Sequence, residues 1–187
     1  QELMERVVTA AKGKPVVLVL MSGSALSVKW ADANIPAIVQ AWYGGQAAGT
    51  AIADVLFGNV SPGGRLPVTF YRSADQLPPF ENYAMKGRTY RYFSGAPLYP
   101  FGHGLSYATF SYTNVVSPKS IAAGVPVQVS VDVRNAGAMA ADEVVQLYVL
   151  PRDPATTAPP RALKGFERIT LQPGAAVNTI AAYLALH

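Results

Sequence analysis

Apolar residues recur with two different spacings along the chain, and the change falls near residue 110. In the first part, Leu3, Val7 and Ala10 stand at helical spacing, and residues 16–21 form an unbroken apolar run. Helical spacing predicts an amphipathic helix over residues 2–11. A short run rich in Val and Leu is typical of a parallel strand covered on both faces. The first part therefore predicts helices that alternate with buried strands.

The pattern predicts four further elements before residue 71: a short helix or irregular crossover over residues 25–33, a second buried strand over 37–42, a helix over 49–57 and a third strand over 66–70. Ile52, Val55 and Leu56 recur at helical spacing, so we expect them to face a sheet before Gly58 ends the helix. Strand, crossover, strand, helix and strand make a fragment of a doubly wound sheet. Because intact sheets of this kind have more strands, we expect an exposed edge.

From Phe110 onwards the period of the pattern is two. Val127, Val129, Val131 and Val133 alternate with polar residues, which predicts a half-buried antiparallel strand. Residues 144–149 and 165–171 continue this pattern, with turns at residues 135–137 and 173–174, and together they predict a small β-sandwich. Residues 178–187 fit a helix nearly as well as a strand, so the pattern leaves the final strand open.

The predicted fold class is therefore α/β followed by all-β. We divide the chain into a partial α/β sandwich domain with its connecting loop, residues 1–105, and a β-sandwich domain, residues 106–187. The chain has 187 residues, of which 50% are hydrophobic and 14% are charged, so buried cores are expected.

Composition excludes several classes of function. The net charge of +4 is scattered along the chain without a basic run, which argues against nucleic-acid binding. The longest apolar run is far shorter than the ~20 residues that a membrane span needs, so no membrane partner is expected. The chain has no cysteine and only His103 and His187, which argues against disulfides, thiolate catalysis and a metal site. No export signal opens the chain, and its composition fits either the cytoplasm or the periplasm.

Three stretches carry a resemblance to a known family: residues 43–70 (YGGQAAGTAIADVLFGNVSPGGRLPVTF), 95–107 (GAPLYPFGHGLSY) and 162–174 (ALKGFERITLQPG). In this order they resemble the C-terminal part of glycoside hydrolase family 3, the β-glucosidases and β-xylosidases. The resemblance implies a parent enzyme with a catalytic (β/α) barrel that carries an aspartate nucleophile. An α/β sandwich domain follows, whose earlier part carries the glutamate acid/base, and then a fibronectin-III-like domain.

The resemblance implies that the chain begins after both catalytic carboxylates, so we expect no glycosidase catalytic residue here. Retaining hydrolysis needs two carboxyl groups about 5 Å apart. The parent would take a carbohydrate substrate, hydrolyse terminal β-linked glucose or xylose, and need no cofactor. The partners we expect are the missing N-terminal catalytic barrel and, through uncovered surface, a second copy in a homo-oligomer. Many members carry a glutamate where this chain has Ala47, so that carboxylate's role is lost here.

An independent serine esterase is the alternative enzyme. Ser22 or Ser24, at the end of a predicted strand, would be the nucleophile, with His103 as base and Asp54 as the third group. The glycine spacing of a nucleophile elbow is absent around both serines. A third interpretation is a non-catalytic stabilising or carbohydrate-binding module.

An aromatic cluster fits either a sugar-facing wall or a seam between domains. Its members are Tyr90, Tyr92, Phe93, Tyr99, Phe101 and Tyr107. We favour the seam, because Pro and Gly between the aromatic residues fix a loop against a surface. The candidate substrate-binding residues are Arg88, Arg91 and Tyr92. The two arginines could hydrogen-bond sugar hydroxyls, and anchoring of the loop is the alternative role for both.

Overall fold

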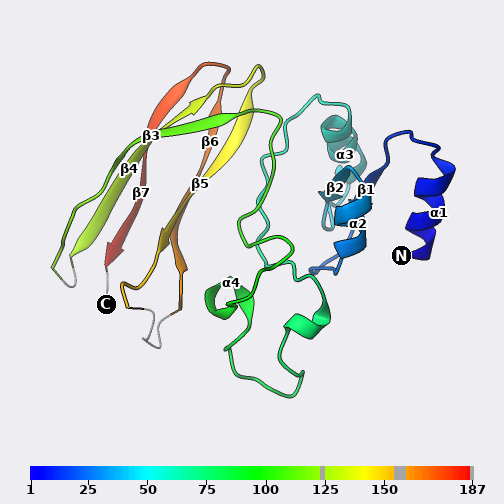
Figure 1. Cartoon of the computed structure of the whole chain (residues 1–187). Coiled ribbons are helices and arrows are strands. Elements are labelled where there is room, and N and C mark those ends of the chain that lie inside the picture. The colour runs from blue at the N-terminus through cyan, green and yellow to red at the C-terminus, as the bar shows by residue number, and fades with distance from the viewer. Residues whose placement is uncertain (123–124, 154–158, 186–187) are drawn as a thin grey trace.

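The computed structural model describes residues 1–122, 125–153 and 159–185, and the backbone alone from residue 180 onwards. An α/β half and a β-sandwich half lie side by side, and the long connection between them passes through the space where they meet (Figure 1). The fold is thus α/β followed by all-β, as the sequence predicts.

The α/β half contains α1 (Glu2–Ala10), β1 (Val17–Leu20), α2 (Lys29–Asn34), β2 (Ala37–Gln40) and α3 (Ala48–Leu56). This order matches the prediction as far as α3. β1 and β2 pair in parallel, with Val17 opposite Ala37 and Leu20 opposite Gln40. Their carboxyl ends therefore meet at one edge of a two-stranded sheet.

The core of the α/β half lies on α2 and the residues that flank it. Val28, Ala31 and Ile35 are buried, and partly buried side chains of α1, β1 and β2 pack against them. No side chain of β1 or β2 is fully buried, and Val17 is 42% exposed. The prediction that these strands are covered on both faces is wrong, because a two-stranded sheet with so few neighbouring elements leaves part of each side chain in solvent.

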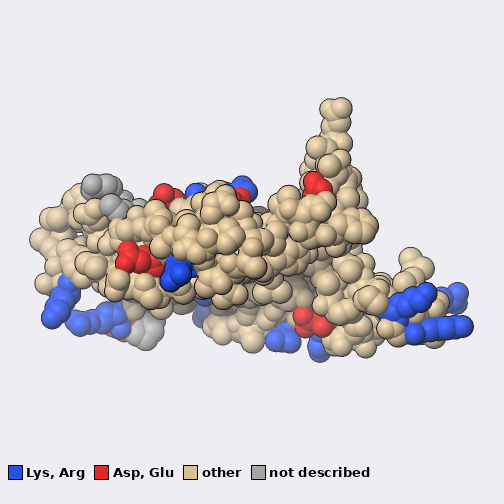
Figure 2. All heavy atoms as spheres, turned by 90° about the horizontal axis from the view of Figure 1, so that it is seen from above, with Lys and Arg blue, Asp and Glu red and all other residues tan. Residues whose placement is uncertain are grey.

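Helix α3 is apolar but has no buried residue. Leu56, at its end, is 42% exposed and the following Phe57 is 83% exposed. Seen from above, a narrow and almost uncharged projection rises over the α/β half (Figure 2). The expected burial of Ile52, Val55 and Leu56 against a sheet is therefore not found.

Residues 66–70 do not form the predicted third strand of the parallel sheet. They run beside residues 98–103 instead. The amide of Leu66 donates to the carbonyl of His103 at 2.8 Å, and Phe70 forms an isolated antiparallel bridge with Tyr99. Pro67 has no N–H to donate, which limits regular ladder formation at this point.

The connection contains the short 3₁₀ helix η1 (Ala74–Gln76) and α4 (Thr89–Tyr92). The β-sandwich follows with β3 (Phe110–Val116), β4 (Pro126–Asn135), β5 (Ala141–Val149), β6 (Ala162–Leu171) and β7 (Ala176–Ala185). One sheet has the order β3-β4-β7 and the other pairs β5 with β6. The final segment is a strand, with Val177 opposite Val133 and Ala185 opposite Pro126, so the helical alternative is wrong.

The sandwich core is formed by inward-facing residues of both sheets: Val131, Val133, Val145, Ile169 and Leu171. The predicted alternation of β4 is confirmed at its second half, where Val131 and Val133 are buried. Asn135 ends this strand and is fully buried. Its side-chain amide donates to the carbonyls of Met139 and Leu171, both at 2.9 Å, which fixes the turn beside the core.

Candidate functional site

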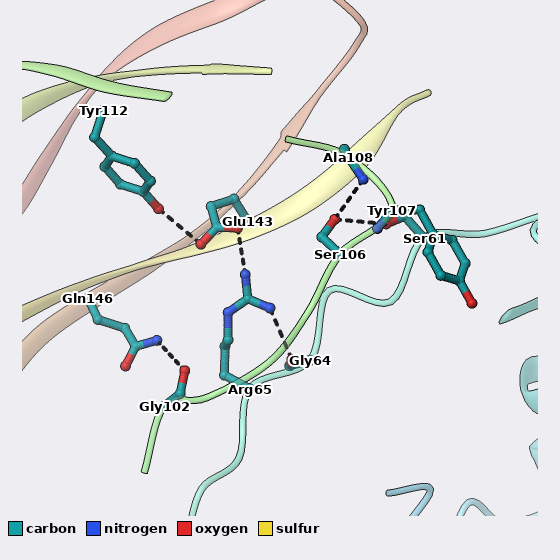
Figure 3. Close-up of polar contacts among 10 residues, drawn as sticks. All are labelled: Ser61, Gly64, Arg65, Gly102, Ser106, Tyr107, Ala108, Tyr112, Glu143 and Gln146. Carbon is teal, nitrogen blue, oxygen red and sulfur yellow. Dashed lines mark hydrogen bonds and ion pairs between the residues drawn. The ribbon is translucent and has the colours of Figure 1, made fainter. Parts of the chain in front are cut away.

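A buried ion pair links the two halves. Nη2 of Arg65, from the α/β half, donates to a carboxylate oxygen of Glu143 on β5 at 2.6 Å, and the side chains are only 13% and 9% exposed. The hydroxyl of Tyr112, on β3, donates to the other oxygen of Glu143 at 2.9 Å (Figure 3). Burial and this hydrogen bond raise the pKa of Tyr112 above its ordinary value. The carboxylate is therefore held from two sides, which is the arrangement that a buried charge requires.

The sequence analysis did not identify Glu143 as a functional residue. The strand's own period contains the signal, because Glu143 shares a face with Ala141 and Val145, both of which are buried. A carboxylate on the inward face of a strand needs a cationic or hydrogen-bonding partner. That partner, Arg65, is distant in sequence and could not be identified from the pattern alone.

Glycines allow the loops of the α/β half to approach β5 closely. Gly102 has φ +81°, and a Cβ placed there would overlap Oε1 of Gln146. Nε2 of Gln146 donates to the carbonyl of Gly102 at 3.1 Å, and Oε1 accepts from the hydroxyl of Tyr148 at 2.6 Å. A side chain at position 102 would separate these groups, so the glycine sets the distance between loop and sheet.

One member of the predicted aromatic cluster, Tyr90, makes contacts across the seam. Tyr90 stacks on Phe101 at 4.2 Å between ring centroids and meets Tyr148 of β5 edge-on at 6.2 Å. The hydroxyl of Tyr90 accepts the amide N–H of Leu163 at 3.1 Å, and the guanidinium of Arg161 lies 5.9 Å from the centroid of the Tyr90 ring. The favoured interpretation, an interdomain seam, is confirmed for Tyr90.

The other cluster members pack within the α/β half and its connection. The ring of Tyr99 stacks on His103 and its hydroxyl donates to Asp32 at 2.6 Å, while burial raises its pKa. Tyr107 donates its hydroxyl to the carbonyl of Val55 at 2.9 Å. Phe93 meets Tyr71 edge-on at 5.0 Å. These contacts attach the connection to the α/β half.

Of the candidate substrate-binding residues, Arg88 has a structural role. Its Nη2 donates to the carbonyls of Asn82 at 2.6 Å and Pro79 at 3.0 Å, which anchors the connecting loop. The guanidinium of Arg91 lies 5.7 Å from the centroid of the Tyr92 ring, one residue along α4. Contact of Arg91 and Tyr92 with a sugar stays a prediction.

The residues of the esterase alternative bind different partners. Oγ of Ser22 donates to the carbonyl of Ser24 at 2.9 Å, and Asp54 accepts from the amide of Asn59 at 3.1 Å. Among the described residues, no hydrogen bond joins His103 to Ser22, Ser24 or Asp54. Catalysis by these four residues stays a prediction.

His103 lies in the seam beside the ion pair. Burial, and then the positive charge of Arg65, lower the pKa of its imidazole below 6.5, while the carboxylate of Asp32 opposes this shift. An open groove of about 450 Å³ passes His103 and is lined by Arg65, Glu143 and Tyr148, among others. The polar side chains that line this groove are largely hydrogen-bonded to one another. These bonds hold the two halves together.

Within residues 1–122, 125–153 and 159–185, no group of three or more His, Cys, Asp or Glu side chains is placed to hold a metal ion. In the same part of the chain, no helix is long and apolar enough to cross a membrane.

Comparison with curated proteins finds relatives that are much longer. The chain is 47% identical to "Xylan 1,4-beta-xylosidase" of Xylanibacter ruminicola, covering 88% of this chain and 19% of that protein. It is 42% identical to "Periplasmic beta-glucosidase" of Salmonella typhimurium, covering 88% of this chain and 23% of that protein. The chain thus spans about a fifth of the length of these relatives.

Solved structures share the fold across both halves. Beta-D-glucoside glucohydrolase from Trichoderma reesei matches 96% of this chain and 29% of its own, with a TM-score of 0.84 and 28% identity. Beta-glucosidase from Listeria innocua, solved in complex with isofagomine, matches 98% of this chain and 27% of its own, with a TM-score of 0.83 and 32% identity.

Two family models match the chain in sequence order. Residues 1–107 match the glycosyl hydrolase family 3 C-terminal domain, and residues 143–180 match the fibronectin type III-like domain. The matched ranges lie on opposite sides of the seam that Arg65 and Glu143 bridge. The chain therefore belongs to glycosyl hydrolase family 3, and it carries that family's C-terminal domain followed by a fibronectin type III-like domain.

Proposed function

We propose that the chain is the C-terminal part of a retaining β-glycosidase that acts on terminal β-linked glucose or xylose. One observation carries this proposal: the similarity to a β-xylosidase and a β-glucosidase extends over 88% of the chain and so includes both halves and the seam. We take residue 105 as the end of the α/β half, which stays a prediction.

The proposed role of this part is to support the catalytic domain and to form one wall of the substrate cleft. The exposed apolar side chains of the α/β half support the first role. Phe57 is 83% exposed and Tyr43 is 77% exposed, and burial of such groups against a neighbouring domain would be favourable.

We further propose that the two catalytic carboxylates belong to the preceding part of the enzyme. Many carboxylates of the described chain already have partners. These are Glu2 with Arg6, Asp32 with Tyr99, Asp54 with Asn59, Asp132 with Asn114 and Asn178, Asp142 with Arg168 and Thr170, and Glu143 with Arg65 and Tyr112. A retaining enzyme instead needs two carboxyl groups about 5–5.5 Å apart with room for the scissile bond between them.

The test is release of nitrophenol from β-glucoside and β-xyloside substrates by the purified chain, alone and mixed with the separately produced N-terminal part of the Xylanibacter relative. We expect no release above background from the chain alone and measurable release from the mixture. Turnover by the chain alone above about 1 s⁻¹, an ordinary enzyme rate, would overturn the proposal.

Nitrophenyl acetate tests the esterase alternative in the same assay. If ester hydrolysis occurs, replacement of His103 by Ala should lower its rate at least ~100-fold, because the base would be lost. An unchanged rate eliminates the mechanism based on Ser22 or Ser24.

A further inference from the structure

Two polar side chains that line the groove beside the ion pair have no polar partner. The imidazole of His103 and the guanidinium of Arg161 form no hydrogen bond or ion pair with another residue of the described chain. Both side chains are half-buried. The carboxylate of Glu143 is already bonded, because Arg65 and Tyr112 each donate to one of its oxygens (Figure 3). The groove therefore contains donors without acceptors.

Two tyrosine rings hold Arg161 in place. Its guanidinium carbon lies 5.9 Å from the ring centroid of Tyr90 and 5.8 Å from that of Tyr148. These two rings come from opposite sides of the seam and meet edge-on. Contact between a guanidinium and an aromatic ring leaves the N–H groups free to donate. Arg161 is therefore oriented for an acceptor before any ligand binds.

His103 reaches the groove from the other side of the seam. Its ring stacks on Tyr99, with 5.2 Å between centroids and 12° between the ring planes. The preceding residue, Gly102, lies against β5, since a Cβ placed there would lie 2.7 Å from the hydroxyl of Tyr148. Arg161 contacts the ring of the same tyrosine. Both side chains without a polar partner therefore lie close to Tyr148.

The charges around the groove favour an anion. Arg65 and Glu143 neutralise one another, and the carboxylate of Asp32 accepts the hydroxyl of Tyr99. Among the described residues, no carboxylate forms an ion pair with Arg161. A guanidinium binds carboxylate and phosphate oxygens through paired N–H groups. The groove, of about 450 Å³, has room for a small anion of this kind.

We propose that this groove binds a small oxyanion, which accepts hydrogen bonds from the guanidinium of Arg161 and the imidazole of His103. Phosphate and the carboxylate of an acidic sugar share the chemistry that these groups recognise, namely oxygens that carry negative charge. The bound anion joins the sandwich half to the connection and so stabilises the seam. The proposal does not depend on the glycosidase activity.

Proton NMR of the whole chain tests the site, because the chain has only two histidines and His103→Gln assigns the signals of His103. The probes are inorganic phosphate, glucuronate and, as the neutral control, methyl β-glucoside, all at one ionic strength. We expect an anion to shift these signals and to raise the pKa of His103, because burial and the charge of Arg65 lower it in the free chain. A response to phosphate, to glucuronate or to both supports the site and identifies its ligand.

A pair of variants tests the role of Arg161. Arg161→Gln removes the charge and should weaken anion binding about ten-fold, as loss of a charged hydrogen-bond donor predicts. Arg134→Gln is the matched control, because Arg134 lines a groove on the outer face of the β3-β4-β7 sheet and has no ion pair with a described residue. Binding to Arg134→Gln should stay unchanged.

Urea unfolding gives a second measurement. Phosphate should raise the unfolding midpoint of the unmodified chain and of Arg134→Gln more than that of Arg161→Gln, whereas its general salt effect is the same in all three chains. Circular dichroism shows whether each variant keeps its fold. No response of His103 to either anion, an equal response to methyl β-glucoside, or equal binding to both variants would overturn the site.

Discussion

The two halves of the chain bury their apolar residues to different extents. In the β-sandwich half, β4, β5 and β6 each have nine or ten residues, and Val133 at the centre is fully buried. In the α/β half, β1 and β2 have four residues each and no fully buried side chain. Apolar sequence alone therefore does not decide burial.

The difference follows from the number of layers in each half. Two sheets that face one another cover each other's inner side chains, as they do around Val145 and Ile169. A two-stranded sheet with few neighbouring elements leaves its edges and part of its faces in solvent. The strands of the α/β half thus have the apolar sequence of buried strands, but their side chains stay partly exposed to solvent.

The first prediction concerns the seam, where the halves share one buried ion pair. Glu143→Ala should lower the free energy of unfolding by about 3–5 kcal/mol, because Arg65 would stay buried without its partner. Urea unfolding measures this loss. The double variant Arg65→Met with Glu143→Leu should recover most of it, and a loss below about 1 kcal/mol in the single variant would show that the pair does not hold the seam.

The second prediction compares equivalent truncations in the two halves. Val133→Ala in β4 should cost about 2 kcal/mol, because it leaves a cavity in the sandwich core. Val17→Ala in β1 should cost less than about 0.5 kcal/mol, because Val17 is 42% exposed. Equal losses in urea unfolding would contradict the difference in burial between the halves.

The third prediction is self-association through the α/β half. Apolar side chains at the end of α3 are exposed, among them Leu56 and Phe57, and their exposure favours association with a second copy of the chain. A symmetric dimer is the commonest form of such an assembly. Sedimentation at micromolar concentration should detect a dimer that Phe57→Ser weakens and that Phe166→Ser, at a 70% exposed sandwich position, leaves unchanged. A monomer that binds no hydrophobic dye would show that this exposed surface does not cause self-association.

The smallest predicted effect is a pH dependence at His103. Its pKa is lowered in the folded chain, so the unfolded chain takes up the proton more readily. The stability that depends on neutral His103 is complete above about pH 6.5 and is lost as the pH falls below that value. Urea midpoints of the unmodified chain and His103→Gln should converge at acidic pH, and a constant difference between them would exclude this contribution.

The spacing of apolar residues along the sequence predicted the helices α1 and α3 and the buried face of β4. Helical periodicity placed α1 and α3 within one residue at each end, and the period of two placed the buried face of β4 at Val131 and Val133. Gly58, with φ +76°, follows the end of α3 as expected. Such signals lie within a few residues of the element that they specify.

Features that depend on distant partners were harder to predict. Residues 66–70 have the sequence of a strand. They pair with Tyr99 and His103, however, and not with a strand of the parallel sheet. The partner of Glu143 is 78 residues away in sequence. The turn after β2 also depends on tertiary structure, because a left-handed Trp42 cannot be inferred from a run of apolar residues.

Hydrogen exchange of the whole chain, followed by mass spectrometry, tests most directly whether the α/β half lacks the layers that would cover it. For the chain alone, we expect strong protection of the amides in β4, β5 and β6 and fast exchange in β1, β2 and α3. Addition of the N-terminal part of the Xylanibacter relative should slow exchange in β1, β2 and α3 and leave the sandwich unchanged. Equal protection of both halves in the chain alone would contradict this account.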